Sequence, residues 1–257
     1  MRLKILSYNI HKGFSANNRK FVLRRMREAI RGTHADIVLL QEVQGEHEKR
    51  KKRVADWPLQ SQFEFLADEI WPHFAYGKNA VYTAGHHGNA VISRFPITFW
   101  ENIDVSSSRI ERRGLLHVVI KVPRFGNLHA ICVHLGLFEK DRTHQVKRIC
   151  QRIESHVLAD EPLVIGGDFN DWKVRASGPL KKNLDVEEAF LKSQGKHART
   201  FPSWMPALRL DRIYYRGMKL SRAECLVDRP WRELSDHAAL TAEFDLLRRR
   251  ATSKLAE

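Results

Sequence analysis

The chain lacks the cysteine pattern of a disulfide-rich or zinc-binding protein. Among 257 residues it has only 3 cysteines, and Cys132, Cys150 and Cys225 are widely spaced and form no paired motif. An odd and sparse set argues against a disulfide framework and against a zinc site. We therefore expect free thiols, with Cys132 and Cys150 in the core, and a reducing compartment, the cytoplasm.

Long apolar runs are absent as well. Met1 is followed directly by a segment that alternates apolar and polar residues, without the apolar stretch and cleavage site of a secretory signal. No run is long enough to span a bilayer, and there is neither a repeat of fixed period nor a low-complexity linker. We expect a soluble monomer in which residues 1–247 form a single domain and 248–257 a basic tail.

Acidic residues are in the minority. The chain has 44 Lys and Arg against 30 Asp and Glu, a net charge of +14 and a pI near 9.9. A charge of this size concentrates anionic partners near the surface, such as nucleic acid, lipid headgroups or phosphorylated small molecules. The alternative is a well-charged surface with no polyanionic partner. Hydrophobic residues make up 43%, which is enough for a packed core.

Apolar periodicity predicts a mixture of strands and helices. Alternating or continuous apolar segments predict strands at residues 3–10, 36–40, 90–93, 97–105, 115–122, 128–133, 162–167, 210–215, 225–227 and 238–244. Helical spacing appears near 21–30, 60–70 and 146–157, and the polar, basic stretch 44–57 is expected to be a mobile loop. This order favours two facing sheets with helices outside over a doubly wound parallel sheet, which needs a helix after nearly every strand.

Acidic, amide and histidine side chains follow the ends of several predicted strands. They are Asn9, Glu42, His134, Asp168, Asn170, Asp211, Asp236 and His237. A strand end holds a reactive group rigidly while the loop exposes it. Singly, each residue has an ordinary interpretation as a turn residue, a solvated cap or a surface group. Only their combination indicates a site.

The segment 163–170 gives the clearest signal of chemistry. Asp168 and Asn170 stand at i and i+2 after a buried strand, so both project to one side at its mouth. Gly166 and Gly167 before them permit close approach of a ligand to the backbone. A carboxylate and an amide in this position suit the activation and orientation of a water beside a phosphate.

Oxygen donors and an imidazole occur elsewhere in the chain. Glu42 offers the hard oxygen that suits magnesium. Asp236 pairs a second hard oxygen with the neighbouring His237, whose imidazole can donate to phosphate or transfer a proton near neutral pH.

A set of short blocks then resembles a known superfamily. In chain order they are Ser7-Tyr8-Asn9-Ile10, Gln41-Glu42, Gly88-Asn89-Ala90-Val91-Ile92-Ser93-Arg94-Phe95-Pro96, His134-Leu135, Gly167-Asp168-Phe169-Asn170, Leu210-Asp211-Arg212-Ile213 and Ser235-Asp236-His237. Each block alone is weak, but the ordered set resembles the endonuclease/exonuclease/phosphatase superfamily over almost the whole chain. The resemblance implies a four-layered α/β sandwich of two mixed β-sheets flanked by helices. It also implies phosphoester hydrolysis with a divalent cation at one edge of the sandwich.

The resemblance also implies roles for individual residues on the metal and water side. Glu42 would be the principal ligand of Mg²⁺, for which Mn²⁺ could substitute, with Asn9 and Asp236 close to the metal or its waters. Asn9 would also face the substrate. Asp168 would position or deprotonate the attacking water, and Asn170 would bind a phosphoryl oxygen.

On the phosphate side, the resemblance makes His237 a contact to the phosphate, with Asp211 holding its tautomer. His134 would be a second imidazole beside the phosphate. Deoxyribonuclease-like members have a carboxylate on a middle strand that orients this first histidine, and Arg113 stands near that place. Arg113 either binds phosphate in bidentate fashion or is a surface cation. Asn89 is either a substrate-binding residue or the start of a strand.

Substrate choice is less defined than the reaction. The basic run 49–53 would track a polyanion backbone, face an anionic membrane or form a solvated loop. The segment 200–206, which contains Phe201 and Trp204, would stack on a base, touch a lipid or pack under the site. Leu210 replaces the cysteine that the inositol-phosphatase branch usually carries before the aspartate, which disfavours that branch.

These features predict a magnesium-dependent phosphodiesterase. Nucleic acid is the favoured substrate, and hydrolysis of a phospholipid or sphingolipid, with peripheral membrane contact, is the alternative. A catalytically inactive polyanion-binding module is the remote third interpretation, against which the retained acidic, amide and histidine side chains argue.

Overall fold

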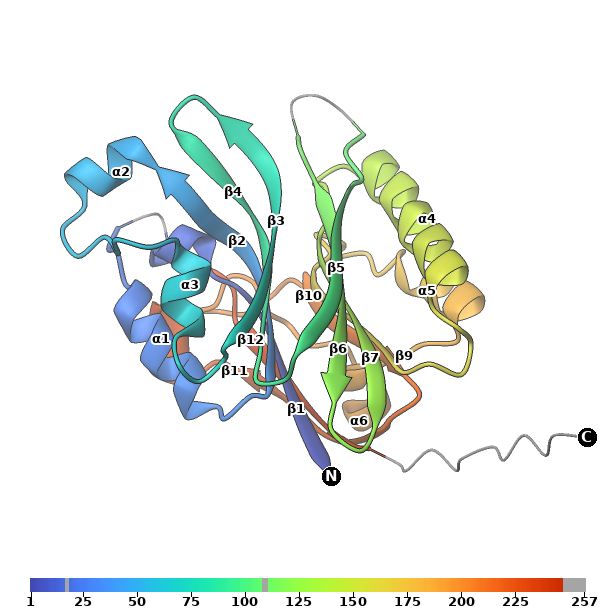
Figure 1. Cartoon of the computed structure of the whole chain (residues 1–257). Coiled ribbons are helices and arrows are strands. Elements are labelled where there is room, and N and C mark those ends of the chain that lie inside the picture. The colour runs from blue at the N-terminus through green and yellow to red at the C-terminus, as the bar shows by residue number, and fades with distance from the viewer. Residues whose placement is uncertain (17–18, 108–110, 247–257) are drawn as a thin grey trace, which may run out of the picture.

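The computed structural model describes residues 1–16, 19–107 and 111–246. The basic tail expected at 248–257 lies outside the described residues. Two six-stranded sheets face each other, and helices cover their outer faces (Figure 1). The predicted fold class, an α/β sandwich of two mixed sheets flanked by helices, is confirmed.

The first sheet has the strand order β11-β12-β1-β2-β4-β3. Its strands are β1 (Arg2–Asn9), β2 (Ile37–His47), β3 (His73–Tyr82), β4 (Gly85–Ser93), β11 (Lys219–Leu226) and β12 (Ala239–Asp245). The central pair β1 and β2 is parallel, and the other neighbours are antiparallel. Helices α1 (Leu23–Gly32) and α3 (Gln62–Ala67) cover the outer face, and α2 (Glu48–Arg53) follows β2 (Figure 1).

The second sheet has the order β5-β6-β7-β8-β10-β9. Its strands are β5 (Ile97–Asp104), β6 (Gly114–Val122), β7 (Gly126–His134), β8 (Leu163–Asp168), β9 (Glu187–Glu188) and β10 (Asp211–Arg216). Here β7 and β8 are the parallel pair. Helices α4 (Glu139–His156) and α5 (Ser177–Leu184) lie on the outer face, α6 (Ala189–Gln194) follows β9, and short 3₁₀ turns η1 (His11–Gly13) and η3 (Trp231–Glu233) complete the elements.

Alternation along each strand explains the layers. In β1, Leu3 and Ile5 belong to the core between the sheets, whereas Leu6 and Tyr8 belong to the core beneath α1. A third core fills the space between the second sheet and α4 with α5. Because successive side chains point to opposite faces, strands that are buried on both faces read as continuous apolar runs.

The prediction of a mobile loop at 44–57 is wrong. Strand β2 continues to His47 and is followed directly by α2. This segment has no apolar pattern, and hydrogen bonds to other parts of the chain hold it instead. The Gln44 backbone amide donates to Gln62 Oε1 at 2.9 Å, and the Glu48 amide donates to the Ala84 carbonyl at 2.9 Å. The sequence pattern also missed β3, α5 and α6. No helix among the described residues is long and apolar enough to cross a membrane.

The sheet register brings the predicted site residues to one edge. Asn9 ends β1 beside Gln41 of the parallel strand β2. His134 ends β7 beside Asp168 of the parallel strand β8, and Asp211 begins β10 opposite the same aspartate. Each sheet thus presents the carboxyl ends of a parallel central pair, and the two pairs end at the same edge of the sandwich.

Candidate active site

Asp168 lies at the centre of the site. Its carboxylate is buried, and its Oδ2 lies 3.2 Å from Asn9 Nδ2, 3.5 Å from His134 Nε2 and 3.7 Å from His237 Nε2. The three neighbouring groups come from β1, from β7 and from the loop before β12. One carboxylate oxygen therefore faces an amide and two imidazoles from both sheets.

His237 is held by a second carboxylate. Its Nδ1 donates to Asp211 Oδ2 at 2.9 Å. Burial alone would lower the pKa of this imidazole, but the carboxylates of Asp211 and Asp168 outweigh burial and raise the pKa to about 10. His237 is consequently a charged donor at neutral pH, and its Nε2 is directed toward Asp168.

His134 has the opposite character. Burial, together with the nearby Arg113 guanidinium, lowers its pKa to about 3, although Asp168 and Glu42 act in the other direction. The ring is therefore neutral at neutral pH. Arg113 itself is bound to Glu111, with Nη2 and Oε1 2.6 Å apart. Arg113 is thus an ion-paired cation close enough to His134 to influence its charge, and its role toward phosphate stays a prediction.

Asn170 is placed by its own backbone. It adopts a left-handed conformation, with φ of 49°, which asparagine tolerates better than most residues. Its backbone amide donates to Asp168 Oδ1 and its Nδ2 donates to the Leu135 carbonyl, both at 2.9 Å. The side-chain amide has two hydrogens, so one remains for a ligand.

Glu42 reaches the site through an irregularity in β2. The pairing with β4 shifts between Leu40 and Val43, and Glu42 has a φ of 54°. A bulge of this kind redirects a side chain out of the regular alternation. Its Oε1 lies 3.4 Å from Asn9 Nδ2. The bulge thus brings a carboxylate from the first sheet to the shared edge.

Lys12 is a site residue that the sequence analysis missed. Its Nζ lies 2.5 Å from Glu42 Oε2. Burial would raise the pKa of Glu42, but the charges of His134 and Lys12 lower it below its usual range. Because His134 is neutral at neutral pH, the ammonium of Lys12 is the cation that matters there. The sequence feature that could have indicated Lys12 is its position, three residues after Asn9 in the turn that follows β1.

Asp236 approaches the site from the loop before β12. Its Oδ1 lies 3.7 Å from His11 Nδ1 and 3.2 Å from the oxygen of the Ser235 hydroxyl. The same hydroxyl donates to the Asn9 carbonyl at 2.8 Å. Ser235 therefore joins this loop to β1, and His11 is a second residue near the site that sequence reasoning did not include.

The oxygen donors suit a hard divalent cation. Glu42 and Asp236 each offer carboxylate oxygens, the ligands that magnesium prefers. A cationic group, the Lys12 ammonium, already lies against Glu42. Asn9 directs its Nδ2 toward Glu42 and Asp168, and its Oδ1 accepts from the His11 amide at 3.0 Å. The side-chain amide of Asn9 would have to rotate before its oxygen could bind a metal.

A second group of potential ligands is less suited to a cation. Asp168, Asp211 and His237 offer ligand atoms within 4.8 Å of one another. However, His237 donates to Asp211 and carries a charge at neutral pH, and a metal ligand requires the neutral imidazole. In this group His237 is therefore a hydrogen-bond donor rather than a metal ligand.

Asn89 lies between the two sheets. Its side chain is fully buried, and its Nδ2 donates to the carbonyls of Gly114 at 3.0 Å and Cys132 at 3.3 Å. These bonds connect β4 of the first sheet with β6 and β7 of the second. Of its two predicted roles, this geometry supports a structural one.

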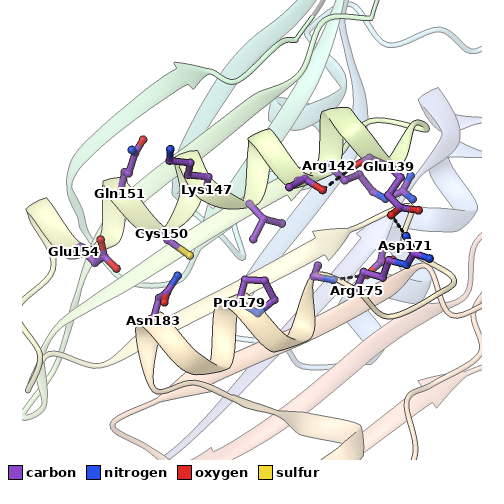
Figure 2. Close-up of a pocket in the computed structure, with 13 residues that line it drawn as sticks. Glu139, Arg142, Lys147, Cys150, Gln151, Glu154, Asp171, Arg175, Pro179 and Asn183 are labelled. Atoms are coloured by element: carbon purple, nitrogen blue, oxygen red, sulfur yellow. Dashed lines mark hydrogen bonds and ion pairs between the residues drawn. The ribbon is translucent and has the colours of Figure 1, made fainter.

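A cavity of about 400 Å³ lies outside this cluster, between α4 and α5 (Figure 2). Its walls include Val146, Cys150 and Pro179, and Asp171 and Arg175 stand at one end. None of the predicted site residues lines it. The cavity is therefore separate from the candidate site at the edge of the sheets.

Known proteins resemble this chain in sequence over nearly its whole length. Residues 6–237 match the sequence pattern of the Endonuclease/Exonuclease/phosphatase family. YbhP of Escherichia coli (strain K12) is 50% identical over 245 residues, which cover 95% of this chain and 96% of YbhP.

Solved structures share the fold at low sequence identity. D. rerio TDP2 complexed with a single strand DNA product has a TM-score of 0.70 and 17% identity, covering 95% of this chain and 99% of that one. A mannosyl-6-phosphatase from Bacteroides thetaiotaomicron has a TM-score of 0.72 and 17% identity, with the same coverages, 95% and 99%. Such similarity shows the fold alone, and the two proteins differ in the molecules that their names mention.

Proposed function

The chain belongs to the endonuclease/exonuclease/phosphatase family, and on that premise we propose that it hydrolyses phosphodiester bonds by in-line attack of an activated water, with magnesium as cofactor. The observation that carries this proposal is the surrounding of Asp168. One oxygen of a buried carboxylate faces the amide of Asn9 and the imidazoles of His134 and His237. This arrangement combines a proton acceptor with donors for a phosphate.

Glu42 and Asp236 would hold the cation. A bound divalent cation would supply positive charge that stabilises the phosphoryl oxygens as negative charge accumulates in the transition state. Lys12 would release Glu42 or remain beside it as a second positive charge. Mn²⁺ is proposed as a substitute because its ligand preference is similar.

The other residues would act on water and phosphate. Asp168 accepts a proton from the attacking water, whose oxygen forms a bond to phosphorus as the bond to the leaving oxygen breaks. The leaving oxygen takes a proton from solvent. His237, charged and held by Asp211, donates to a phosphoryl oxygen. His134 and Asn170 donate further hydrogen bonds from neutral groups. Removal of one preorganised donor of this kind typically costs about a hundredfold or more in rate.

Nucleic acid is the first proposed substrate class. The net charge of +14 and the cationic helix α2 suit a polyanion. Trp172, two residues after Asn170, and Trp204, on the loop before β10, are both exposed. Exposed aromatic side chains can stack on nucleic-acid bases. TDP2, whose structure contains a single strand DNA product, has the same fold.

A phospholipid or sphingolipid is the second proposed class. The side chains exposed near the site include Leu137 and Met205, and aliphatic groups do not stack on bases. The same positive charge that suits nucleic acid also suits an anionic membrane.

We also propose a cytoplasmic location for the protein. The three free thiols, Cys132, Cys150 and Cys225, support this proposal.

A substrate panel tests the proposed reaction. Purified protein is assayed with Mg²⁺, Mn²⁺ or chelator against plasmid, abasic duplex, single-stranded RNA, anionic and sphingomyelin vesicles, and a chromogenic phosphodiester. Cleavage that requires metal and is lost in both Asp168→Ala and His237→Ala supports the proposal and identifies the substrate class. If no substrate is cleaved while the protein binds polyanions, the interpretation as an inactive binding module replaces it.

A further inference from the structure

Exposed apolar side chains lie on three loops that adjoin the strands of the predicted active site. Leu137, Phe138, Trp172, Trp204 and Met205 are 55%, 70%, 44%, 62% and 60% exposed. We call these five residues the apolar rim. They lie on the loops that follow β7 and β8 and on the loop that precedes β10, the strands that carry His134, Asp168 and Asp211. Large apolar groups gathered beside a site on a protein surface mark a contact with another molecule.

One side of the rim is fixed by a buried arginine. Arg142 of α4 donates to the carbonyls of Gly136 at 3.2 Å and Leu137 at 2.5 Å. Its guanidinium carbon lies 5.2 Å from the centre of the Trp172 ring. In Figure 2, Arg142 lies near Glu139 at the first turn of α4. A buried cation therefore contacts both loops, the one with Leu137 through hydrogen bonds and the one with Trp172 through its ring.

The other side of the rim is tied to the loop that contains His237. The Ser203 amide donates to the Asp236 carbonyl at 2.7 Å, and its hydroxyl donates to the Ser235 carbonyl at 2.6 Å. The Phe201 ring lies 5.1 Å from the His237 ring. Trp204 and Met205 follow this anchored segment directly. The apolar rim thus flanks the candidate site around Asp168 and His237 on two sides.

Cationic side chains lie at the same end of the molecule as the apolar rim, next to the first sheet. In α2, Lys49, Lys51, Lys52 and Arg53 are all exposed, and the described part of the chain provides no ion pair for any of them. Figure 1 shows α2 and the tip of the β3–β4 hairpin at the end of the molecule where α4 begins. Val81, at that tip, is 68% exposed. Positive charge and apolar groups therefore share one end.

We propose that this end of the protein docks on the surface of an anionic phospholipid bilayer. The apolar rim enters the interfacial region, and α2 faces the headgroups. Tryptophan favours that depth, and the combination of a cationic segment with apolar groups is typical of interfacial binding. Leu137, Met205 and Val81 are aliphatic, which favours lipid over stacked bases. Because the rim borders the site, the docking surface presents lipid phosphodiesters to it, an inference that rests on the proposed function.

Vesicle flotation tests the docking without hydrolysis. The full chain is mixed, in chelator, with neutral phosphatidylcholine vesicles or with vesicles containing phosphatidylglycerol. We expect binding to the anionic vesicles, and a loss of about tenfold or more in partition for Phe138→Ser with Trp204→Ser, since two exposed apolar groups no longer enter the interface. Lys51→Glu with Lys52→Glu is expected to reduce binding to a similar extent and to make it less sensitive to salt.

Matched variants separate this surface from general effects. Trp100→Ser with Leu158→Ser changes apolar groups that are 50% and 68% exposed outside the rim. Lys181→Glu with Lys182→Glu makes the same charge change on α5. Both should bind vesicles like the wild type. All variants should melt cooperatively near the wild-type temperature, because every substituted side chain is exposed.

The outcomes are distinct from those of the hydrolysis assay. If the wild type ignores anionic vesicles, or if the matched variants lose binding as much as the rim variants, the docking surface is rejected. Binding of a single-stranded oligonucleotide that only the rim and α2 variants lose would assign the surface to nucleic acid and also overturn the proposal. Vesicle binding without hydrolysis of any substrate would reject the proposed function and leave the docking surface standing.

Discussion

The ammonium of Lys12 lies 2.5 Å from Oε2 of Glu42, the residue that the proposed function makes the principal metal ligand. A lysine and a divalent cation at the same carboxylate compete, since each neutralises the same charge. Lys12 therefore balances the charge of Glu42, and a metal bound there would have to compete with it.

The first prediction concerns this competition. Lys12→Met should increase Mg²⁺ affinity on the order of tenfold, because the cation no longer displaces an ammonium. It should also lower the melting temperature in chelator, since Glu42 loses its partner. Isothermal titration with Mg²⁺ measures the affinity. Lys20→Met, at an exposed position, should change neither quantity, and unchanged or weaker Mg²⁺ binding in Lys12→Met would show that the two cations do not compete.

The second prediction concerns the Asp211–His237 pair. Asp211→Asn keeps the shape of the side chain but removes the charge that stabilises the imidazolium, so turnover should fall by about a hundredfold or more. Steady-state rates with a chromogenic phosphodiester measure the loss. Asp228→Asn, on the surface, serves as the control. A variant that retains most of its turnover would remove His237 from the phosphate-binding role.

The third prediction separates structure from chemistry at Asn89. Asn89→Ala removes the two buried hydrogen bonds to the carbonyls of Gly114 and Cys132, which should reduce the free energy of unfolding by about 1–3 kcal/mol. Urea denaturation measures the change, and Asn127→Ala, at an exposed position, should be neutral. The folded variant should keep near wild-type turnover. A large loss of turnover at unchanged stability would instead place Asn89 in the substrate site.

The fourth prediction concerns acid stability and a buried histidine pair. Arg152 Nε donates to His117 Nδ1 at 3.2 Å, so His117 Nε2 carries the proton directed at His129 Nδ1, 2.9 Å away. Burial, with the positive charges of His129 and Arg152, lowers the pKa of His117 from 6.5 to about 3. The neutral ring is thus part of the folded state.

Because the folded pKa of His117 is depressed, the unfolded chain takes up the proton first as the pH falls. The stabilisation is complete above pH 6.5 and declines as the pH falls from 6.5 toward about 3, by roughly 1 kcal/mol per pH unit for this group. His117→Gln should lose less stability than the wild type between pH 7 and pH 5, as measured by urea denaturation at each pH. His144→Gln, at an exposed site, should follow the wild-type curve, and parallel curves for all three proteins would contradict the assignment.

Sequence reasoning identified the catalytic candidates that follow strand ends. Asp168, His134 and Asp211 could be placed because apolar strands precede or follow them, and the sheet register then brings them together. Lys12 could not be predicted in the same way. It lies on a 3₁₀ turn with a φ of 57°, and its partner Glu42, 30 positions later in the sequence, is placed by the bulge in β2.

Other features depend on tertiary contacts that sequence patterns do not report. Strand β2 extends through Gln44 because a glutamine of α3 binds its backbone and a hairpin strand pairs with it. The charge state of His134 depends on Arg113, which directly precedes β6, the neighbouring strand of β7. Local propensity cannot show either relationship, since both arise from residues that are far apart in the chain.

The bond between Asn9 and Asp168 joins the two sheets at the edge where the chemistry is proposed. Glu42 and Asn9 belong to one sheet, and Asp168 and His134 to the other. The relative position of the reactive groups is therefore a property of the core between the sheets rather than of any single loop. If a substitution removed a methylene from a side chain of that core, the two sheets would pack at a slightly different distance. Asn9 and Glu42 would then shift against Asp168 and His134, although the substituted side chain touches none of them. Turnover would then decline while the chain remained folded, so catalysis would report the spacing of the two sheets more sensitively than melting does.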